Sequence, residues 1–211
     1  MVHTQPDLFA QFGQIDIYLF DQLLRARITP GMRIVDAGCG DGRNIVYLLQ
    51  TGYEVFGADA DAGAIAAVRA LATRLAPHLP AENFRTELLE HLSFPDAFAD
   101  VVICSAVLHF ARDEAQFDAM LRGCWRLLKS GGLLFTRLAS SIGLEDRVRP
   151  LGDGRYRLPD GSDRFLVDEA MLIDRTRALG AALADPIKTT VVQDQRSMTT
   201  WVIRSQGTLT D

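Results

Sequence analysis

The residues best suited to chemistry lie together in residues 34–44, which read IVDAGCGDGRN. Three glycines at alternate positions, Gly38, Gly40 and Gly42, let the backbone turn sharply and approach a ligand without interference from a Cβ atom. Two acids, Asp36 and Asp41, accompany them. A pyrophosphate favours exposed amides without nearby carboxylates, whereas two acids favour a ligand with positive charge. The loop therefore predicts a cofactor site, and its charge favours a cationic cofactor.

A further acid follows the glycine loop at the spacing expected for nucleoside binding. Asp59 ends the apolar run of residues 53–58 and comes roughly twenty residues after the first glycine, where an acid accepts hydrogen bonds from ribose hydroxyls. The alternative is that Asp59 only caps the helix that follows. We favour the ribose role because the glycine loop and the acid occur together.

Apolar runs that alternate with helical patterns must position these residues. Strands are predicted at residues 33–35, 53–58, around Phe84, 101–104 and 133–137. Helices are predicted at residues 43–50, 62–75 and 113–128, the last ended by the turn KSGG. This alternation predicts a parallel sheet covered on both faces, a doubly wound α/β fold. Ligands of such sheets lie beyond the carboxyl ends of the strands, where the glycine loop and Asp59 both fall.

The segments on either side of this region differ from it in composition and pattern. Residues 6–25 carry apolar residues at helical spacing, so we interpret residues 1–30 as an N-terminal helical segment. Residues 140–165 are rich in glycine, proline and charge, with a hairpin expected about Asp160 and Gly161, and we interpret them as an insertion near the mouth of the site. A helix at residues 168–179 and strands at 187–192 and 198–204 follow. We expect a single domain over residues 1–211.

Composition narrows the classes of function. The 211 residues are 48% hydrophobic and carry a net charge of -5, which argues against nucleic acid as a partner. No run of apolar residues is long enough for a membrane span, and three cysteines without metal-ligand spacing predict a reducing compartment. We expect a cytoplasmic protein, a monomer or homodimer, with no bound metal, no membrane partner and no nucleic-acid partner.

Four segments in order resemble the successive motifs of class I S-adenosylmethionine-dependent methyltransferases: VDAGCGDGRN, VFGADADAGAI, LSFPDAFADVVICSAVLHF and LLKSGGLLF. The resemblance covers residues 32–136. It implies a Rossmann-like, seven-stranded sheet of order 3-2-1-4-5-7-6, with the last strand antiparallel. The segment SMTTWVIRS fits that strand. The resemblance also implies S-adenosylmethionine as the cofactor, whose sulfonium and ammonium suit the acids of the loop.

The resemblance also implies which residues hold this cofactor. Asp36 would act on the methionine ammonium, Asp59 would hold the ribose, Ala60 would pack on the adenine, and the backbone of Ser105 would face the methionine end. The whole set implied is Asp36, Gly38, Cys39, Gly40, Asp59, Ala60, Leu88, Leu89 and Ser105. One departure concerns adenine, because the family often places an acid where this chain has Leu88. Backbone groups of Leu88 and Leu89 remain available to adenine, and Glu87 would substitute if the loop were shifted by one residue.

Two side chains are candidates for catalysis on the acceptor side. His109 follows the fourth strand and would act as a general base, although a structural role is an equal alternative. Arg137 ends the fifth strand and would hold an acidic group of the acceptor, or else form an ion pair with an acid such as Glu145. Methyl transfer to an activated sulfonium needs positioning more than a dedicated base, so neither role is required.

Three functions remain to be weighed. We favour methyl transfer from S-adenosylmethionine to a small-molecule acceptor through oxygen, nitrogen or sulfur. The alternative is a catalytically silent S-adenosylmethionine-binding partner or regulatory protein. A nicotinamide-dependent oxidoreductase is disfavoured, because the third glycine of G-x-G-x-x-G would fall on Arg43. The segment CSAVLH, in place of an NPPY-like sequence, argues against methylation of DNA bases or glutamine.

Overall fold

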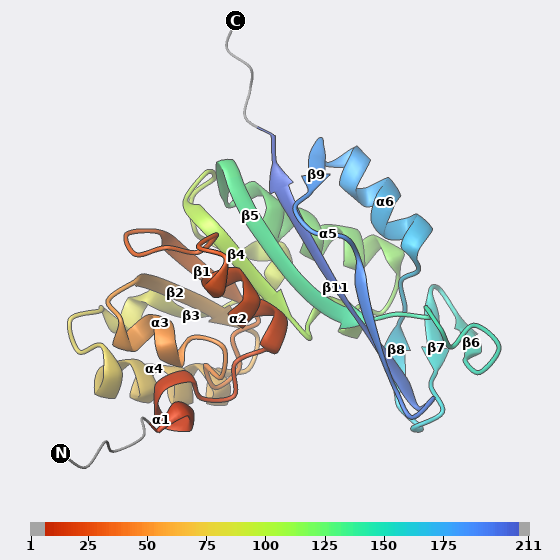
Figure 1. Cartoon of the computed structure of the whole chain (residues 1–211), viewed down its shortest axis with the longest axis horizontal. Coiled ribbons are helices and arrows are strands. Elements are labelled where there is room, and N and C mark those ends of the chain that lie inside the picture. The colour runs from red at the N-terminus through yellow and green to blue at the C-terminus, as the bar shows by residue number, and fades with distance from the viewer. Residues whose placement is uncertain (1–6, 207–211) are drawn as a thin grey trace, which may run out of the picture.

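A mixed sheet of eight strands forms the centre of the computed structural model, which describes residues 7–206 (Figure 1). Along the sheet the strands are β3 (Phe84–Thr86), β2 (Glu54–Asp59), β1 (Arg33–Ala37), β4 (Ala99–Ser105), β5 (Leu128–Ala139), β11 (Arg196–Ser205) and β10 (Lys188–Val192). Strand β11 is antiparallel to β5. Strand β10 pairs with residues 196–200 of β11, and β9 (Ala181–Leu183) pairs with residues 203–205 of the same strand. The predicted order 3-2-1-4-5-7-6 with an antiparallel last strand is confirmed, and β9 shares the sixth position with β10.

Successive residues of the apolar strands enter two different cores. In β4, Val101 and Ile103 pack on one face of the sheet, whereas Val102 and Cys104 pack on the other. Three helices cover the first face: α2 (Ile17–Leu24), α3 (Val46–Gln50) and α4 (Ala62–Leu75). Two cover the second face: α5 (Glu114–Arg126) and α6 (Glu169–Ala178). A continuous apolar run in the sequence is therefore a strand buried on both faces.

Aspartates set the first residues of the longer helices. The side chains of Asp61, Asp113 and Asp168 accept hydrogen bonds from backbone N–H groups in the first turns of α4, α5 and α6. Such caps satisfy amide groups that have no partner within the helix. None of the helices in residues 7–206 combines the length and the apolar character that crossing a bilayer requires.

Several boundaries differ from the sequence prediction. The N-terminal helical segment is two helices, α1 (Leu8–Phe12) and α2, and its first six residues lie outside the described part. Helix α3 begins three residues later than expected, because Ile45 N donates to Gly42 O and closes a turn first. The KSGG sequence does not separate α5 from a later strand, since β5 starts at Leu128 and includes it.

The insertion forms a small antiparallel sheet of its own beside the carboxyl end of β5 (Figure 1). Its strands are β6 (Arg149–Gly152), β7 (Arg155–Arg157) and β8 (Asp163–Phe165). The predicted hairpin about residues 160–161 is confirmed by the pairing of β7 with β8. The guanidinium of Arg155 donates to the carbonyl of Ala111 over 2.9 Å, which fastens this sheet to the segment that follows β4.

Helix α5 lies unusually close to the short 3-10 turn η2 (Leu89–His91). A Cβ atom built on Gly123 would stand 1.9 Å from the carbonyl oxygen of Leu89, far inside van der Waals contact. Only glycine permits this approach. Gly123 therefore sets the distance between α5 and the turn after β3.

We expect Gly123→Ala to lower the free energy of unfolding by about 1–3 kcal/mol, because helix and turn must separate. Urea denaturation measures the change. Gly63→Ala is the matched control, since Gly63 also lies in a helix and a Cβ there would meet only the side chain of Asp61, at 3.1 Å. Equal stability of Gly123→Ala and wild type would contradict the close approach.

Candidate functional site

The glycine loop is tied to the carboxyl end of β2 by hydrogen bonds. The carbonyl oxygen of Ala58 accepts from Gly38 N at 2.7 Å and from Cys39 N at 3.0 Å. The Asp59 carboxylate accepts from Gly40 N at 2.9 Å. Gly38 has a φ of +81°, and a Cβ atom there would stand 2.3 Å from a methyl carbon of Val107. The loop thus needs glycine both for its conformation and for its contact with the segment after β4.

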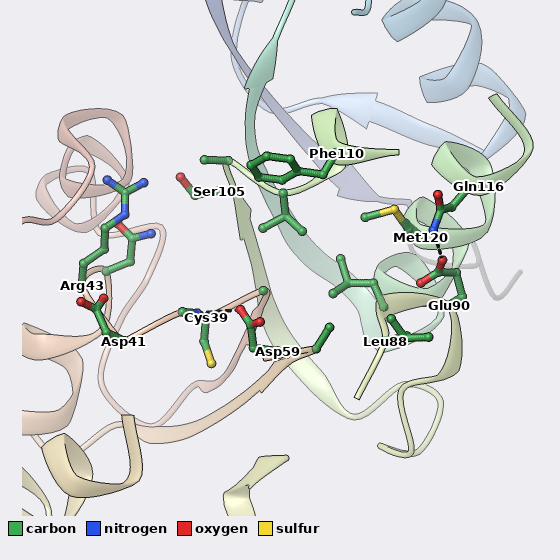
Figure 2. A pocket seen from close by; sticks show the side chains of 17 residues that line it. Cys39, Asp41, Arg43, Asp59, Leu88, Glu90, Ser105, Phe110, Gln116 and Met120 are labelled. Atoms are coloured by element: carbon green, nitrogen blue, oxygen red, sulfur yellow. Dashed lines mark hydrogen bonds between the residues drawn. The ribbon is translucent and has the colours of Figure 1, made fainter. Parts of the chain in front are cut away.

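A cavity of about 660 Å³ opens beyond the carboxyl ends of β1, β2 and β4 (Figure 2). All the predicted cofactor residues except Asp36 line it: Gly38, Cys39, Gly40, Asp59, Ala60, Leu88, Leu89 and Ser105. The structure therefore brings together residues from four separate parts of the sequence. Cavities of this size hold small organic ligands.

Asp59 lies in the wall of this cavity with both oxygens engaged by backbone amides. One accepts from Gly40 N, and the other accepts from Asp61 N at 2.9 Å. The cap of α4 is Asp61, whose side chain accepts from Gly63 N at 2.7 Å. The helix-cap alternative for Asp59 is therefore wrong, and the carboxylate is held at the cavity wall with lone pairs left for a ligand.

Asp36 lies beneath the cavity instead of in its wall. It is 1% exposed, and its Oδ2 atom has no hydrogen-bond partner among residues 7–206. Burial raises the pKa of Asp36 to about 7, with the charge of Asp59 adding to the rise and that of Arg43 opposing it. A cationic group placed next to this carboxylate would stabilise its charged form.

Two further buried polar atoms lie at the ends of the neighbouring strands. The Oγ atom of Ser105, at the end of β4, and the Nε atom of Arg137, in β5, have no partner within the described part of the chain. Ser105 and Arg137 are paired in the sheet register, and β1 with Asp36 pairs on the other side of β4. Buried groups of this kind are normally satisfied, so unpaired atoms clustered at three adjacent strand ends mark a binding region.

The cavity includes nine residues outside the predicted cofactor set, of which the sequence analysis had singled out only Asp41, for its charge. They are Asp41, Arg43, Asn44, Glu90, Ala106, Val107, Phe110, Gln116 and Met120. Arg43 and Asn44 follow directly on the glycine loop, so adjacency in sequence could have found them. Gln116 and Met120 come from α5, whose pattern reads as an ordinary amphipathic helix, and no signal in the sequence singles them out.

The turn after β3 forms one end of the cavity. Leu88 is 51% exposed there, and Leu89 is buried beside it. Glu87, the predicted substitute for the family's acid, instead accepts hydrogen bonds from the backbone N–H and the hydroxyl of Ser93. It is not among the lining residues. Glu90 takes its place in the wall and accepts from the amide of Gln116 at 2.7 Å (Figure 2).

His109 is buried and bonded through the nitrogen that a base would use. Its Nδ1 atom accepts from Ala139 N at 3.1 Å, which places the proton on Nε2. Burial lowers the pKa of His109 to about 4, and the nearby charge of Arg164 adds to the decrease. The ring also packs against Phe110, with 4.6 Å between centroids. This geometry supports the structural role for His109.

Arg137 forms an ion pair, but not with the predicted acid. Its Nη1 atom lies 2.6 Å from Oδ2 of Asp16, whose side chain is fully buried. Glu145 instead accepts from Gly143 N, so the predicted partner was wrong. Asp16 also caps α2 through Tyr18 N, and its own N–H donates to the Asn44 side chain. The N-terminal helix is therefore joined to both the glycine loop and β5.

No group of three or more His, Cys, Asp or Glu side chains in residues 7–206 is arranged to hold a metal ion. The polar side chains of the cavity are instead amides, carboxylates, the guanidinium of Arg43, the hydroxyl of Ser105 and the thiol of Cys39. An open α/β sheet with a glycine loop at its first strand and acids at the ends of β1 and β2 defines a cofactor-binding class of Rossmann-like proteins.

Comparisons with known proteins narrow this class. Residues 35–136 match the family model of the methyltransferase domain. An uncharacterized methyltransferase of Synechocystis is 34% identical over 106 residues, which is 50% of this chain and 46% of that protein. A ubiquinone biosynthesis O-methyltransferase of Chelativorans is 28% identical over 175 residues, covering 76% and 67% of the two chains.

A solved structure shows the same fold at low identity. The 1,6-didemethyltoxoflavin-N1-methyltransferase of Burkholderia thailandensis, with bound 1,6-didemethyltoxoflavin and S-adenosylhomocysteine, superposes with a TM-score of 0.70 and 18% identity, covering 95% of this chain and 81% of that chain. Residues 35–136 are thus similar to the methyltransferase domain, and relatives that share this region include probable S-adenosylmethionine-dependent methyltransferases of mycobacteria. The chain spans about half the length of the first curated relatives that it matches.

The cofactor of this family, S-adenosylmethionine, fits the residues present. Its ammonium would suit the buried carboxylate oxygen of Asp36 that has no hydrogen-bond partner among residues 7–206. Its ribose hydroxyls would donate hydrogen bonds to the Asp59 carboxylate in the cavity wall. The glycine loop also leaves open space beside the cavity, since a Cβ atom at Gly40 would meet no other atom within 4 Å. The chemistry of the donor set therefore matches a cationic nucleoside ligand.

Binding of S-adenosylhomocysteine should weaken on acidification, because Asp36 must lose a proton before it can meet the ammonium. Below the Asp36 pKa of about 7, affinity should fall by up to about tenfold per pH unit. Calorimetric titration between about pH 5.5 and 8 measures this. Asp36→Asn should bind more weakly at the upper pH and show a flat profile. A wild-type affinity independent of pH would contradict the role of Asp36.

Asp59→Ala should weaken binding of S-adenosylhomocysteine by about 1–3 kcal/mol, since a carboxylate that accepts ribose hydroxyls is lost. Calorimetry gives the affinity, and thermal unfolding verifies that the variant is folded. Asp174→Ala removes an exposed carboxylate on α6 and serves as the control for charge. Equal losses in both variants would refute a specific ribose contact.

Proposed function

We propose that the protein transfers a methyl group from S-adenosylmethionine to a small-molecule acceptor, through an oxygen, nitrogen or sulfur atom. The observation that carries the proposal is the cavity of about 660 Å³, which continues from the cofactor residues past Val107 to Phe110. Phe110 is 58% exposed and stands at the side of the insertion. A bounded cavity of this kind suits a compact acceptor better than a polymer.

The chain's own residues would act by binding and orienting. When bound, S-adenosylmethionine supplies a methyl group already activated by a sulfonium. The glycine loop and Asp59 would hold one reactant in place, while the segment after β4, from Ala106 to Phe110, would bound the space for the other. Holding two reactants in line removes much of the entropic barrier without a dedicated base. The neutral, bonded imidazole of His109 accords with a mechanism of this type.

Our proposal for the acceptor rests on the net charge of the chain and on the names of similar proteins. The acidic chain, with a net charge of -5, disfavours nucleic acid. Relatives in the family include a ubiquinone biosynthesis O-methyltransferase, and the toxoflavin enzyme of the same fold carries an N-methyltransferase name. Arg137 keeps its place as a candidate for an acidic acceptor group, because its Nε atom is buried without a partner in the described residues. Three buried free cysteines support a reducing, cytoplasmic location.

The test is a turnover assay with S-adenosylmethionine and a panel of small phenols, amines, carboxylates and thiols, read as S-adenosylhomocysteine formed above the acceptor-free rate. We expect turnover with at least one member, and loss of it in Asp59→Ala. Binding of S-adenosylmethionine without turnover on the panel would favour the silent alternative. Turnover confined to DNA, RNA or protein would contradict the proposed acceptor class.

A further inference from the structure

The end of the cavity formed by η2 and α5 carries a polar pair on an otherwise apolar surface. Leu88, Leu89 and Met120 supply apolar walls there, and Glu90 and Gln116 supply the polar atoms (Figure 2). Glu90 comes from η2 and Gln116 from α5, so the pair exists only in the folded chain. It lies at the end of the cavity opposite Asp41 and Arg43, with Asp59 between the two ends (Figure 2).

The orientation of the Gln116 amide is settled by its neighbours. Its Oε1 atom accepts from Arg112 N at 3.0 Å, and its Nε2 atom donates to Oε1 of Glu90 at 2.7 Å. Exchanging the two amide atoms would place like groups against each other at both contacts. The amide nitrogen is therefore the atom next to Glu90.

Each member of the pair retains hydrogen-bonding capacity toward the cavity. Among residues 7–206, Nε2 of Gln116 meets no second acceptor, and the Oε2 atom of Glu90 meets no donor. No Lys, Arg or His in this part of the chain forms an ion pair with Glu90. The pair thus presents one acceptor and one donor side by side, in a fixed order.

This pattern is the complement of an adenine edge, where an amino donor stands beside a ring-nitrogen acceptor. We propose that Glu90 and Gln116 read the adenine of the cofactor, with the Glu90 carboxylate accepting from the exocyclic amino group and Gln116 Nε2 donating to an adjacent ring nitrogen. They would take the role of the acid that the resemblance implies at the position of Leu88. Gly123 supports the pair, because its missing Cβ lets α5 approach the Leu89 carbonyl and brings Gln116 to Glu90.

The experiment compares the binding of S-adenosylhomocysteine with that of S-inosylhomocysteine, in which a carbonyl replaces the amino group of the base. Calorimetry on the full chain gives both dissociation constants, independently of turnover and of the acceptor. Wild type should prefer the adenine compound by about tenfold or more, because a hydrogen bond to a charged acceptor is lost and a carbonyl faces the carboxylate.

Glu90→Gln should reduce that preference by about tenfold. The new amide presents an N–H₂ group, which suits the carbonyl of the inosine compound and repels the adenine amino group. Glu87→Gln is the matched control: it makes the same change three residues earlier, in a side chain bonded to Ser93 outside the cavity wall. Its preference should equal that of wild type.

Gln116→Met provides a second variant that keeps the length of the side chain and removes the donor. It should weaken S-adenosylhomocysteine binding and lower the preference in the same direction. The proposal is overturned if Glu90→Gln leaves the ratio of the two dissociation constants unchanged, whether or not both ligands bind more weakly. It is also overturned if Glu87→Gln lowers the ratio as much as Glu90→Gln. Failure of methyl transfer would leave these ratios unaffected.

Discussion

The site depends on the bonds that hold the end of β1 against the end of β2. One carbonyl, that of Ala58, accepts from two consecutive loop amides, and Asp59 holds a third. These three bonds give the glycine loop a fixed shape while the sheet register carries β1 and β2 to the same level. Because parallel strands end at one edge, a short loop anchored there can meet the segments that follow β3 and β4.

The electrostatics of the site follow from buried polar atoms near the strand ends that have no hydrogen-bond partner in the described residues. Near the carboxyl ends of β1, β4 and β5, the side chains of Asp36, Ser105 and Arg137 each have one buried polar atom without a hydrogen-bond partner among residues 7–206. Burial alone drives Asp36 toward its neutral form, whereas a bound cation would favour the charged one. Burial of Asp36 therefore carries an unfavourable desolvation of its charged form, which a neighbouring cationic group would offset. Nothing in this balance specifies the acceptor.

The sheet and the methyl-donor side could be predicted because they rest on local patterns. Buried strands, the glycine loop and Asp59 are each visible in a short window of sequence, and all but one of the residues selected for the cofactor line the cavity, whereas the acceptor-side candidates His109 and Arg137 do not. The other parts of the site depend on contacts between segments that are far apart in the sequence. Gln116 looks like any polar residue of an amphipathic helix until Gly123 brings α5 onto η2. The Asp16 partner of Arg137 lies 121 positions away, so proximity in sequence favoured Glu145 instead.

The long pairing of β11 with β5 has a consequence for any attempt to study the domain in pieces. The family match ends at residue 136, inside β5, while seven residues of β5 pair with β11 from the end of the chain. A fragment cut at the family boundaries would lose β11 and α2, expose Phe135 and its neighbours, and present a bare strand edge. Such an edge recruits other chains and leads to aggregation. The segment that matches the family is thus expected to need both of its flanks to stay free of aggregation.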